Sequence, residues 1–266
     1  MQQQPVALVT GSGGGIGAAA CRALEVAGYR VYGTTRRPHE DGGDRHLAMD
    51  VTDDASVAAA VATVLDRSGR LDVLVNNAGV GASGAAEESS PGQARQIFEV
   101  NVFGLIRTTR AVLPRMRAQG SGRIINVSSV YGFVPAPYMA LYAASKHAVE
   151  GYSESLDHEL REHGIRVLLV EPAFTRTAFD ANLLRADSPV PAYESRRRTA
   201  DRLIQEAVRT GDEPAVAAKA IVAAATDRKP KLRYPAGSTA SRVSLLRRVV
   251  PARAFDRQIQ KLNHLS

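Results

Sequence analysis

The chain is poor in sulfur and in aromatic rings. Its 266 residues include no tryptophan, one cysteine and four methionines, and aromatic residues make up 5% of the total. A single cysteine, Cys21, cannot form an internal disulfide, so it is expected to pack as a small hydrophobic residue. The six histidines are scattered without the spacing of metal ligands, so we expect no metal site.

Long hydrophobic runs are also missing. No apolar stretch approaches the length needed to span a bilayer, and the first residues, MQQQP, lack the basic and then apolar pattern of a secretory leader. Hydrophobic content of 44% and charged content of 23% are ordinary for a globular protein. We therefore expect a cytoplasmic protein in which residues 1–266 form a single domain.

Apolar strands and amphipathic helices alternate along the sequence. Strands are expected at 6–10, 30–35, 72–75, 123–128, 165–170 and 231–235, and helices between them, for example 55–66. Glycines at 28, 69, 120 and 164 stand near expected helix ends, and Pro114 is expected to kink or break the helical stretch 91–118. The alternation predicts an α/β fold, a Rossmann-like doubly wound parallel sheet with helices on both faces.

Tyr142 and Lys146, in the run YAASK, lie four residues apart and therefore on one face of an expected helix. A phenol with an ordinary pKa of about 10 is a poor acid–base group at neutral pH. An ammonium about 4 Å away favours the phenolate by about 4 kcal/mol at an effective dielectric of about 20, which would bring that pKa to about 7. The pair predicts proton transfer, although this spacing also occurs on ordinary helix surfaces.

Two other segments could bind a ligand. Ser128 and Ser129 follow an apolar strand in GRIINVSS, at the strand end where open parallel sheets bind ligands. The run TGSGGGIG, residues 10–17, follows the first strand and begins a helix. Its glycines would let the backbone approach a phosphate, and the helix amino end would attract it. Each segment alone could be an ordinary turn, but the strand–turn–helix context favours nucleotide binding.

Together these motifs resemble the short-chain dehydrogenase/reductase family, in its single-domain branch. The matching segments are Thr10-Gly11-x-x-x-Gly15-Ile16-Gly17, Asn76-Asn77-Ala78-Gly79, Asn101, Ser129, Tyr142-x-x-x-Lys146 and Glu171-Pro172. Their order and spacing match from about residue 6 to residue 177, and the family's length fits the whole chain. The pattern is most similar to the hydroxysteroid-dehydrogenase-like members.

The resemblance implies a role for each matching residue. Tyr142 would protonate the substrate carbonyl oxygen, Ser129 would hold that oxygen, and Lys146 would lower the pKa of Tyr142 and bind the nicotinamide ribose. Asn101, otherwise an ordinary helix residue, would hold a water that links Lys146 to solvent. The thirteen-residue spacing to Tyr142 favours Ser129 over Ser128. The other implied cofactor-binding residues are Gly11, Ser12, Gly15, Ile16, Gly17, Asp50, Val51, Asn77, Ala78, Gly79, Pro172, Thr175 and Thr177.

The end of the second expected strand, RVYGTTRRP, bears on the choice of cofactor. Enzymes that bind NAD carry an acid there, which accepts hydrogen bonds from the ribose. In this chain the position is Thr35, and Arg36 and Arg37 follow with guanidinium groups suited to a 2′-phosphate. We therefore favour NADP over NAD; the alternative is that both arginines are solvated loop charges. Asp50 could likewise simply cap the next turn.

An apolar substrate is expected, either a ketone or a secondary alcohol. Segment 178–210 would form a lid over it. The side chains that could line the pocket, or could equally belong to the core, are Tyr131, Phe133, Tyr138, Met139, Phe174, Phe179, Leu183, Leu184 and Tyr193. One departure from the family is Ala173, where glycine is usual. Alanine adopts positive φ less readily than glycine, which puts the path of loop 172–177 in question.

Positive charge is concentrated at the carboxyl end. Residues 228–266 contain ten Lys or Arg and one acid, giving +9, so residues 1–227 sum to −2 of the total +7. Residues 238–266 would form a basic extension with helices near 239–249 and after Pro251. We favour a solvated basic face beside an apolar contact with the body or another subunit, over contact with anionic lipid. A nucleic-acid partner is not expected, because stacking aromatics are few.

The sequence thus predicts an NADP(H)-dependent oxidoreductase that interconverts a small apolar ketone and a secondary alcohol, assembled as a homodimer or homotetramer. The alternative is a non-catalytic NADP-binding sensor or scaffold on the same fold. Such a protein would be expected to lose Ser129, Tyr142 or Lys146, and the chain retains all three.

Overall fold

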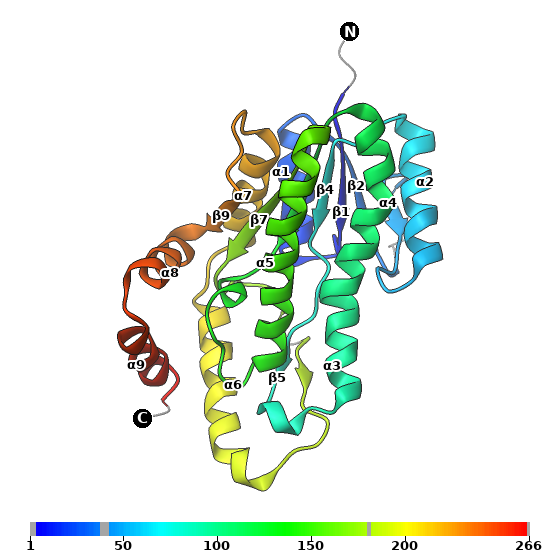
Figure 1. The fold of residues 1–266 in the computed structure, drawn as a ribbon. Helices are drawn as coiled ribbons and strands as arrows, with labels where there is room; N and C mark the ends of the chain where they lie inside the picture. The colour runs from blue at the N-terminus through cyan, green and yellow to red at the C-terminus, as the bar shows by residue number, and fades with distance from the viewer. Residues whose placement is uncertain (1–3, 38–42, 180–181, 265–266) are drawn as a thin grey trace.

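Seven parallel strands form the centre of the fold, in the order β3-β2-β1-β4-β6-β7-β9 (Figure 1). The computed structural model describes residues 4–37, 43–179 and 182–264. Residues 180–181 of the expected lid and 265–266 of the basic extension lie outside this description. The strand order and the helices on both faces confirm the predicted Rossmann-like, doubly wound, single-domain fold.

The elements are bounded as follows. The strands of the main sheet are β1 (Val6–Thr10), β2 (Arg30–Thr35), β3 (His46–Ala48), β4 (Val73–Asn76), β6 (Gly122–Val127), β7 (Ile165–Pro172) and β9 (Arg233–Ala236). The helices are α1 (Gly15–Val26), α2 (Asp54–Ser68), α3 (Pro91–Phe98), α4 (Gly104–Gln119), α5 (Ala140–Leu160), α6 (Glu194–Arg209), α7 (Pro214–Thr226), α8 (Gly237–Val249) and α9 (Ala252–Leu262). Short turns η2 (Ala86–Glu88), η4 (Val130–Gly132), η5 (Arg161–His163) and η6 (Pro191–Tyr193) complete the connections.

Two hydrophobic layers hold the helices to the sheet. Along β1 the side chains alternate between the faces, as the pleat of a strand requires. Ala7 and Val9 pack in a buried cluster with α1 and α7, whereas Val6 and Leu8 pack in a second cluster with α2, α4 and α5. Strands covered on both faces explain the continuous apolar runs in the sequence.

All six predicted strands are present, with bounds that shift by at most two residues. A further strand that the sequence did not predict, β3, forms at the edge of the sheet just before Asp50. Of the kink or break expected at Pro114, the break is wrong, because α4 runs through this residue without interruption. Arg110, whose carbonyl would have received the missing hydrogen bond, is exposed, so water can bond to that carbonyl. The irregular turn instead lies upstream, where Glu99–Phe103 forms a π-helical segment, η3.

A second, two-stranded sheet lies apart from the main one. Strand β5 (Ala82–Ser83) pairs in parallel with β8 (Leu184–Arg185), and so joins the loop after β4 to the expected lid. The chain then continues through α6, returns to the main sheet, and ends in α8 and α9, which extend along one side of the molecule (Figure 1). Within the described residues, no helix is both long and apolar enough to cross a membrane.

Candidate active site

A cavity of about 490 Å³ lies at the carboxyl ends of β1, β4, β6 and β7. This is the edge of an open parallel sheet where ligands bind. The predicted site residues that line it are Gly11, Gly15, Ile16, Asn77, Ala78, Gly79, Ser129, Tyr142, Lys146, Pro172, Thr175 and Thr177. Residues predicted for the same site that do not line it are Ser12, Gly17, Arg36, Arg37, Asp50, Val51 and Asn101.

The glycine-rich turn is packed tightly against the segment after β4. A side chain at Gly17 would place its Cβ 2.2 Å from the carbonyl oxygen of Gly11, and one at Gly11 would lie 2.9 Å from Ala78 Cα. The Thr10 hydroxyl accepts hydrogen bonds from the backbone N–H groups of Asn77 (3.0 Å) and Ala78 (2.9 Å). The glycines therefore allow the turn to pack closely against the segment after β4, and the Thr10 hydroxyl fixes the two together. The result is a rigid backbone cradle suited to a pyrophosphate.

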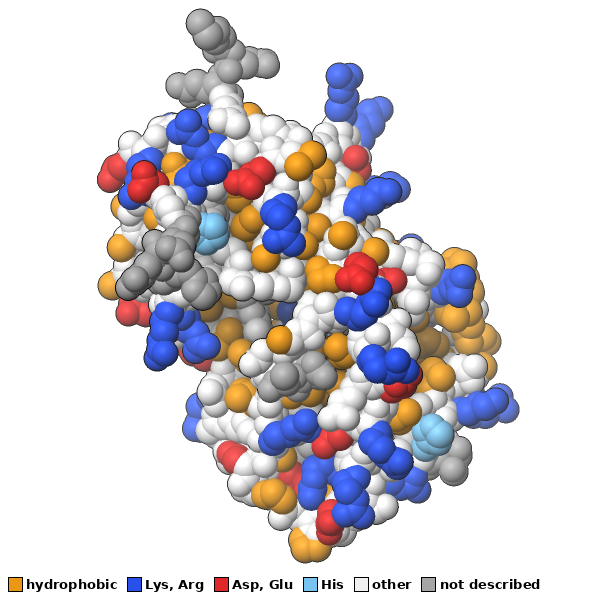
Figure 2. All heavy atoms as spheres, turned by 180° about the vertical axis from the view of Figure 1, so that it is seen from behind, with side chains coloured by type: hydrophobic (Ala, Val, Ile, Leu, Met, Phe, Trp, Pro, Cys, Tyr) orange, Lys and Arg blue, Asp and Glu red, His pale blue; other side chains and the backbone are white. Residues whose placement is uncertain are grey.

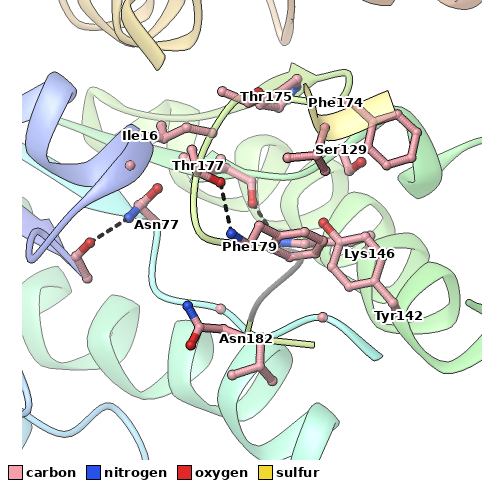
Figure 3. A pocket seen from close by; sticks show the side chains of 18 of the residues that line it. Ile16, Asn77, Ser129, Tyr142, Lys146, Phe174, Thr175, Thr177, Phe179 and Asn182 are labelled. Carbon is pink, nitrogen blue, oxygen red and sulfur yellow. Dashed lines mark hydrogen bonds between the residues drawn. The ribbon is translucent and has the colours of Figure 1, made fainter. Parts of the chain in front are cut away.

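Ser129, Tyr142 and Lys146 face the same cavity (Figure 3). Ser129 begins the η4 turn and its hydroxyl accepts a hydrogen bond from Tyr131 N–H (3.2 Å), while Tyr142 and Lys146 lie one turn apart on α5. Lys146 Nζ lies 5.8 Å from the centre of the Tyr142 ring and donates to the carbonyl oxygen of Val127 (2.9 Å). The arrangement brings a hydroxyl, a phenol and an ammonium together, as the sequence predicted.

Burial controls the protonation of this group. It raises the pKa of Tyr142 to about 12, although a hydrogen bond with the Ser129 side chain opposes the shift. Burial also lowers the pKa of Lys146 to about 8, and the negative charge of Glu150 opposes that shift. This direction is opposite to the predicted lowering of the Tyr142 pKa, because withdrawing the phenol from water disfavours its charged form. At neutral pH Tyr142 is a neutral proton donor beside a mostly charged lysine.

Asn101 holds two segments together behind the site. It lies in the π-helical turn η3, and its side chain exchanges two hydrogen bonds with the backbone of Val80, at 2.8 and 2.9 Å. Its amide also donates to the Ser145 hydroxyl (3.0 Å), which donates to the Tyr142 carbonyl oxygen (2.7 Å). Asn101 thus connects the wall after β4 to the helix that carries Tyr142, a contact that the sequence alone did not suggest.

Ala173 resolves the question about the loop after β7. Among the described residues, only Tyr138 and His264 are non-glycines with positive φ, so Ala173 adopts an ordinary backbone conformation. The loop then brings Thr177 to the glycine-rich turn, where a Cβ on Gly15 would lie 3.0 Å from Thr177 Cγ2. Alanine is accommodated without strain, and both candidate threonines, Thr175 and Thr177, line the cavity.

The substrate end of the cavity is apolar and is partly lined by residues of the expected lid. Phe179 packs against the Tyr142 ring with centroids 5.4 Å apart, and Tyr131 contacts both Tyr142 and Phe174 edge to face. Met139 also lines this end. The other candidates, Phe133, Tyr138, Leu183, Leu184 and Tyr193, do not line the cavity. Leu183 belongs instead to the hydrophobic cluster beneath it.

Charged side chains lie at the carboxyl end of β2. Arg36 and Arg37 are exposed immediately after the strand. Asp50 accepts hydrogen bonds from the Thr52 N–H (2.9 Å) and hydroxyl (2.8 Å), which lower its pKa, and Arg36 contributes to the same shift. Asp50, Val51 and the arginines therefore lie near one another, outside the described walls of the cavity but at the same edge of the sheet.

A buried ionic cluster lies next to Lys146. Arg233 on β9 bonds to Glu150, Glu154 and Glu171, of which Glu150 and Glu171 have side chains 6% and 1% exposed. Burial and the nearby charge of Glu150 raise the pKa of Glu171 to about 7, and Arg233 opposes the shift. Sequence reasoning missed this cluster. A signal was present, since Glu150 continues the Tyr142 and Lys146 face by one more helical turn.

The sequence also missed other parts of the cavity wall. These are Val80, Gly81, Val127 and Val130, whereas Gly13 and Gly14 belong to the predicted glycine-rich run and Ala178, Asn182 and Val208 to the expected lid. Their place in the wall depends on tertiary packing that hydrophobic periodicity does not encode. Among the described residues, no group of three His, Cys, Asp or Glu side chains is placed to hold a metal ion.

Comparison with known proteins gives consistent matches. The family described as short chain dehydrogenase matches residues 5–188. A protein named 3-ketodihydrosphingosine reductase from Bacteroides thetaiotaomicron is 37% identical over 238 residues, which cover 88% of each chain. A crystal structure of a short-chain dehydrogenase from Streptomyces avermitilis has a TM-score of 0.84 and 36% identity, covering 99% of this chain and 98% of that one.

Two further similar structures contain nicotinamide cofactors. A short chain dehydrogenase/reductase from Burkholderia phymatum, in complex with NAD, has a TM-score of 0.80 and 29% identity, covering 97% of this chain and 95% of that one. A short chain dehydrogenase from Burkholderia cenocepacia, in complex with NADP, has a TM-score of 0.77 and 29% identity, covering 97% and 99%. Proteins of this shape thus bind either cofactor.

Proposed function

The chain belongs to the short-chain dehydrogenase/reductase family, and on that premise we propose that it is an NADP(H)-dependent oxidoreductase interconverting an apolar ketone and a secondary alcohol. One observation carries the proposal. Ser129, Tyr142 and Lys146 line the same cavity as the glycine-rich turn, so a proton donor lies within reach of a bound dinucleotide. The alternative, a sensor or scaffold, gives no reason for a buried neutral phenol at this position.

The residues present fit a dinucleotide. The backbone N–H groups of the glycine-rich turn would hold the pyrophosphate. Gly11 and Gly17 keep this turn in its compact path, because a side chain at either position would collide with backbone. Asp50 and Val51 would contact the adenine, and Arg36 or Arg37 would bind the 2′-phosphate. The supporting observation for NADP is the pair of exposed arginines after Thr35, where an enzyme specific for NAD would carry an acid.

In carbonyl reduction the bound cofactor would supply a hydride to the carbonyl carbon. Tyr142 would donate its phenol proton to the carbonyl oxygen, for which a pKa of about 12 keeps it protonated at neutral pH. The Ser129 hydroxyl would donate a hydrogen bond to the same oxygen, and charged Lys146 would bind the ribose. Hydride and proton together convert the ketone to the alcohol, and solvent would then reprotonate the Tyr142 phenolate.

The substrate class follows from the aromatic end of the cavity. Tyr131, Met139, Phe174 and Phe179 offer apolar surface beside Tyr142, and the Bacteroides relative is named as a reductase of a ketone. We propose an apolar ketone as substrate and the secondary alcohol as product. Two further expectations complete the proposal: a cytoplasmic location, which the sequence composition predicts, and assembly as a homodimer or homotetramer.

The test has two parts. Wild type is screened against ketones and alcohols with both NADPH and NADH, and the variant Tyr142→Phe is then assayed on the best substrate. The variant keeps the ring but lacks the acid, so turnover of the best substrate should fall about 10²- to 10⁴-fold. Its Kd for NADPH, measured by fluorescence, should stay within a few-fold of wild type. Turnover close to wild type would remove Tyr142 from the mechanism, and binding without any turnover in the screen would favour the sensor.

A further inference from the structure

The outer side of α8 and α9 carries an exposed apolar patch. Its members are Leu245, Leu246, Val249 and Leu262, whose exposed fractions are 62%, 47%, 66% and 65%. The first three lie within one turn of each other on α8, and therefore on one side of that helix. The favoured expectation was an apolar contact with the body or with another subunit, and within this chain these four residues do not pack against the body.

Cations surround this patch. Arg242 lies three residues before Leu245 and four before Leu246, and therefore on the same side of α8 as both leucines. Arg248 is exposed next to Val249 in the sequence. Arg253, Arg257 and Lys261 are exposed on α9. Residues 238–266 contain six Lys or Arg and one acid, giving +5. Figure 2 shows hydrophobic and basic side chains side by side along the edge of the molecule where the chain ends.

The tail also contacts two segments that lie near the substrate end of the cavity. Arg247 stacks on Phe255 at 5.2 Å and donates to the carbonyl oxygen of Phe133 (3.1 Å), two residues from Tyr131 of the cavity wall. Arg196 at the start of the lid helix α6 donates to the carbonyl oxygen of His264. A surface bound by α8 and α9 would therefore lie next to two segments that cover the substrate end of the cavity.

We propose that the outer face of α8 and α9 binds the surface of an anionic lipid bilayer. The exposed leucines and the arginines beside them complement two parts of such a surface. The apolar side chains would insert at the boundary of the acyl chains, and the cations would bind the anionic head groups. A second copy docked on the same face would bring together two tails that each carry +5, and like charges repel. A nucleic acid would require stacking rings, and Phe255 is already covered by Arg247.

The test is co-sedimentation of the full-length protein with vesicles of phosphatidylcholine, with or without phosphatidylglycerol, at low and high salt. Wild type should bind only the anionic vesicles, and high salt should release it. The variant with Arg242, Arg248, Arg253 and Arg257 changed to Gln should lose most binding, because each charge contributes about fivefold to partitioning. The variant Leu245→Ser, Leu246→Ser, Val249→Ser should also lose it.

A matched control changes four exposed cations outside the tail, Arg22, Arg110, Arg117 and Lys219, to Gln, which removes the same net charge. This variant should bind vesicles like wild type. Equal binding by the two Gln variants, or no binding of wild type to anionic vesicles, would overturn the proposal. So would a wild-type dimer in light scattering that the serine variant converts to monomer, because a second copy would then cover the patch. NADPH binding, measured in parallel, checks that each variant is folded and tests the proposed function separately.

Discussion

Replacing Glu171 by glutamine should stabilise this protein at alkaline pH, although it removes a partner of Arg233. The Glu171 side chain is 1% exposed, and one of its oxygens, Oε2, is buried without a hydrogen-bond partner. Burial and the charge of Glu150 raise the pKa of Glu171 to about 7 from an ordinary 4.5. Glutamine has nearly the same shape as the protonated acid, so it mimics the form that the folded protein prefers.

The magnitude follows from linkage between protonation and folding. Because the pKa is higher in the folded state, the stability due to Glu171 is fully present below about pH 4.5 and is lost as pH rises through about 7. One pKa unit corresponds to about 1.4 kcal/mol, so the loss is about 3 kcal/mol at pH 8. The unfolding free energy of the variant should not fall in this way, because glutamine does not ionise. In a chain of this size that corresponds to a Tm higher by about 6–12 °C at pH 8.

Urea unfolding of both proteins at several pH values between 5 and 8 measures the effect. The difference in unfolding free energy between variant and wild type should be small at pH 5 and should grow towards pH 8. Glu154→Gln is the matched control, because Glu154 bonds to the same arginine but its side chain is 46% exposed, and its difference should vary little with pH. A difference for Glu171→Gln that is flat with pH, or that grows more unfavourable, would refute the reasoning.

Three other predictions concern the site. Arg36→Glu should weaken NADPH binding about 10- to 150-fold, with Arg37→Glu tested beside it; unchanged Kd values in both variants would show that neither arginine binds the 2′-phosphate. Gly81→Val should raise KM for the ketone without changing the NADPH Kd, because a Cβ there would lie 2.3 Å from Leu183 and 2.4 Å from Phe179. Gly151→Ala is the control, because no atom lies within 4 Å of the added Cβ. Equal KM values in the two variants would show that a side chain at Gly81 does not disturb the substrate end of the cavity. Ketone reduction should fall as pH rises through about 8, where Lys146 loses its charge, and alcohol oxidation should rise towards the Tyr142 pKa of about 12; a reduction rate that climbs above pH 8 would contradict these protonation states.

The sheet was predictable because its strands are buried on both faces and read as apolar runs bounded by turns. The placement of Ser129 was predictable as well, since it follows a strand at the edge where parallel strands end. The shared helix face of Tyr142 and Lys146 was predictable from their four-residue spacing. The pKa of Tyr142 was not, because the cost of burying a phenol depends on the lid and on Tyr131, which are brought to it by tertiary packing.

Other features depended on contacts between distant segments. The cluster of Arg233 with Glu150 and Glu171 joins residues 62 to 83 positions apart, and no local pattern encodes such a pairing. The helix through Pro114 shows the opposite failure, in which a strong local signal was overridden because α4 is held by buried side chains such as Val112 and Met116 on either side of it.

The pairing of β5 with β8 affects how the enzyme could be re-engineered. Glu88, fully buried beyond β5, accepts hydrogen bonds from Ala85 N–H and Val190 N–H and bonds to Arg197 of α6. The loop 82–88 and the lid residues 182–190 are therefore one interlocked module contributed by two distant stretches of sequence. A chimera that imports only the lid of a relative would replace Arg197, the charged partner of the buried Glu88 carboxylate, whereas exchanging both stretches together would keep each carboxylate with its own partner.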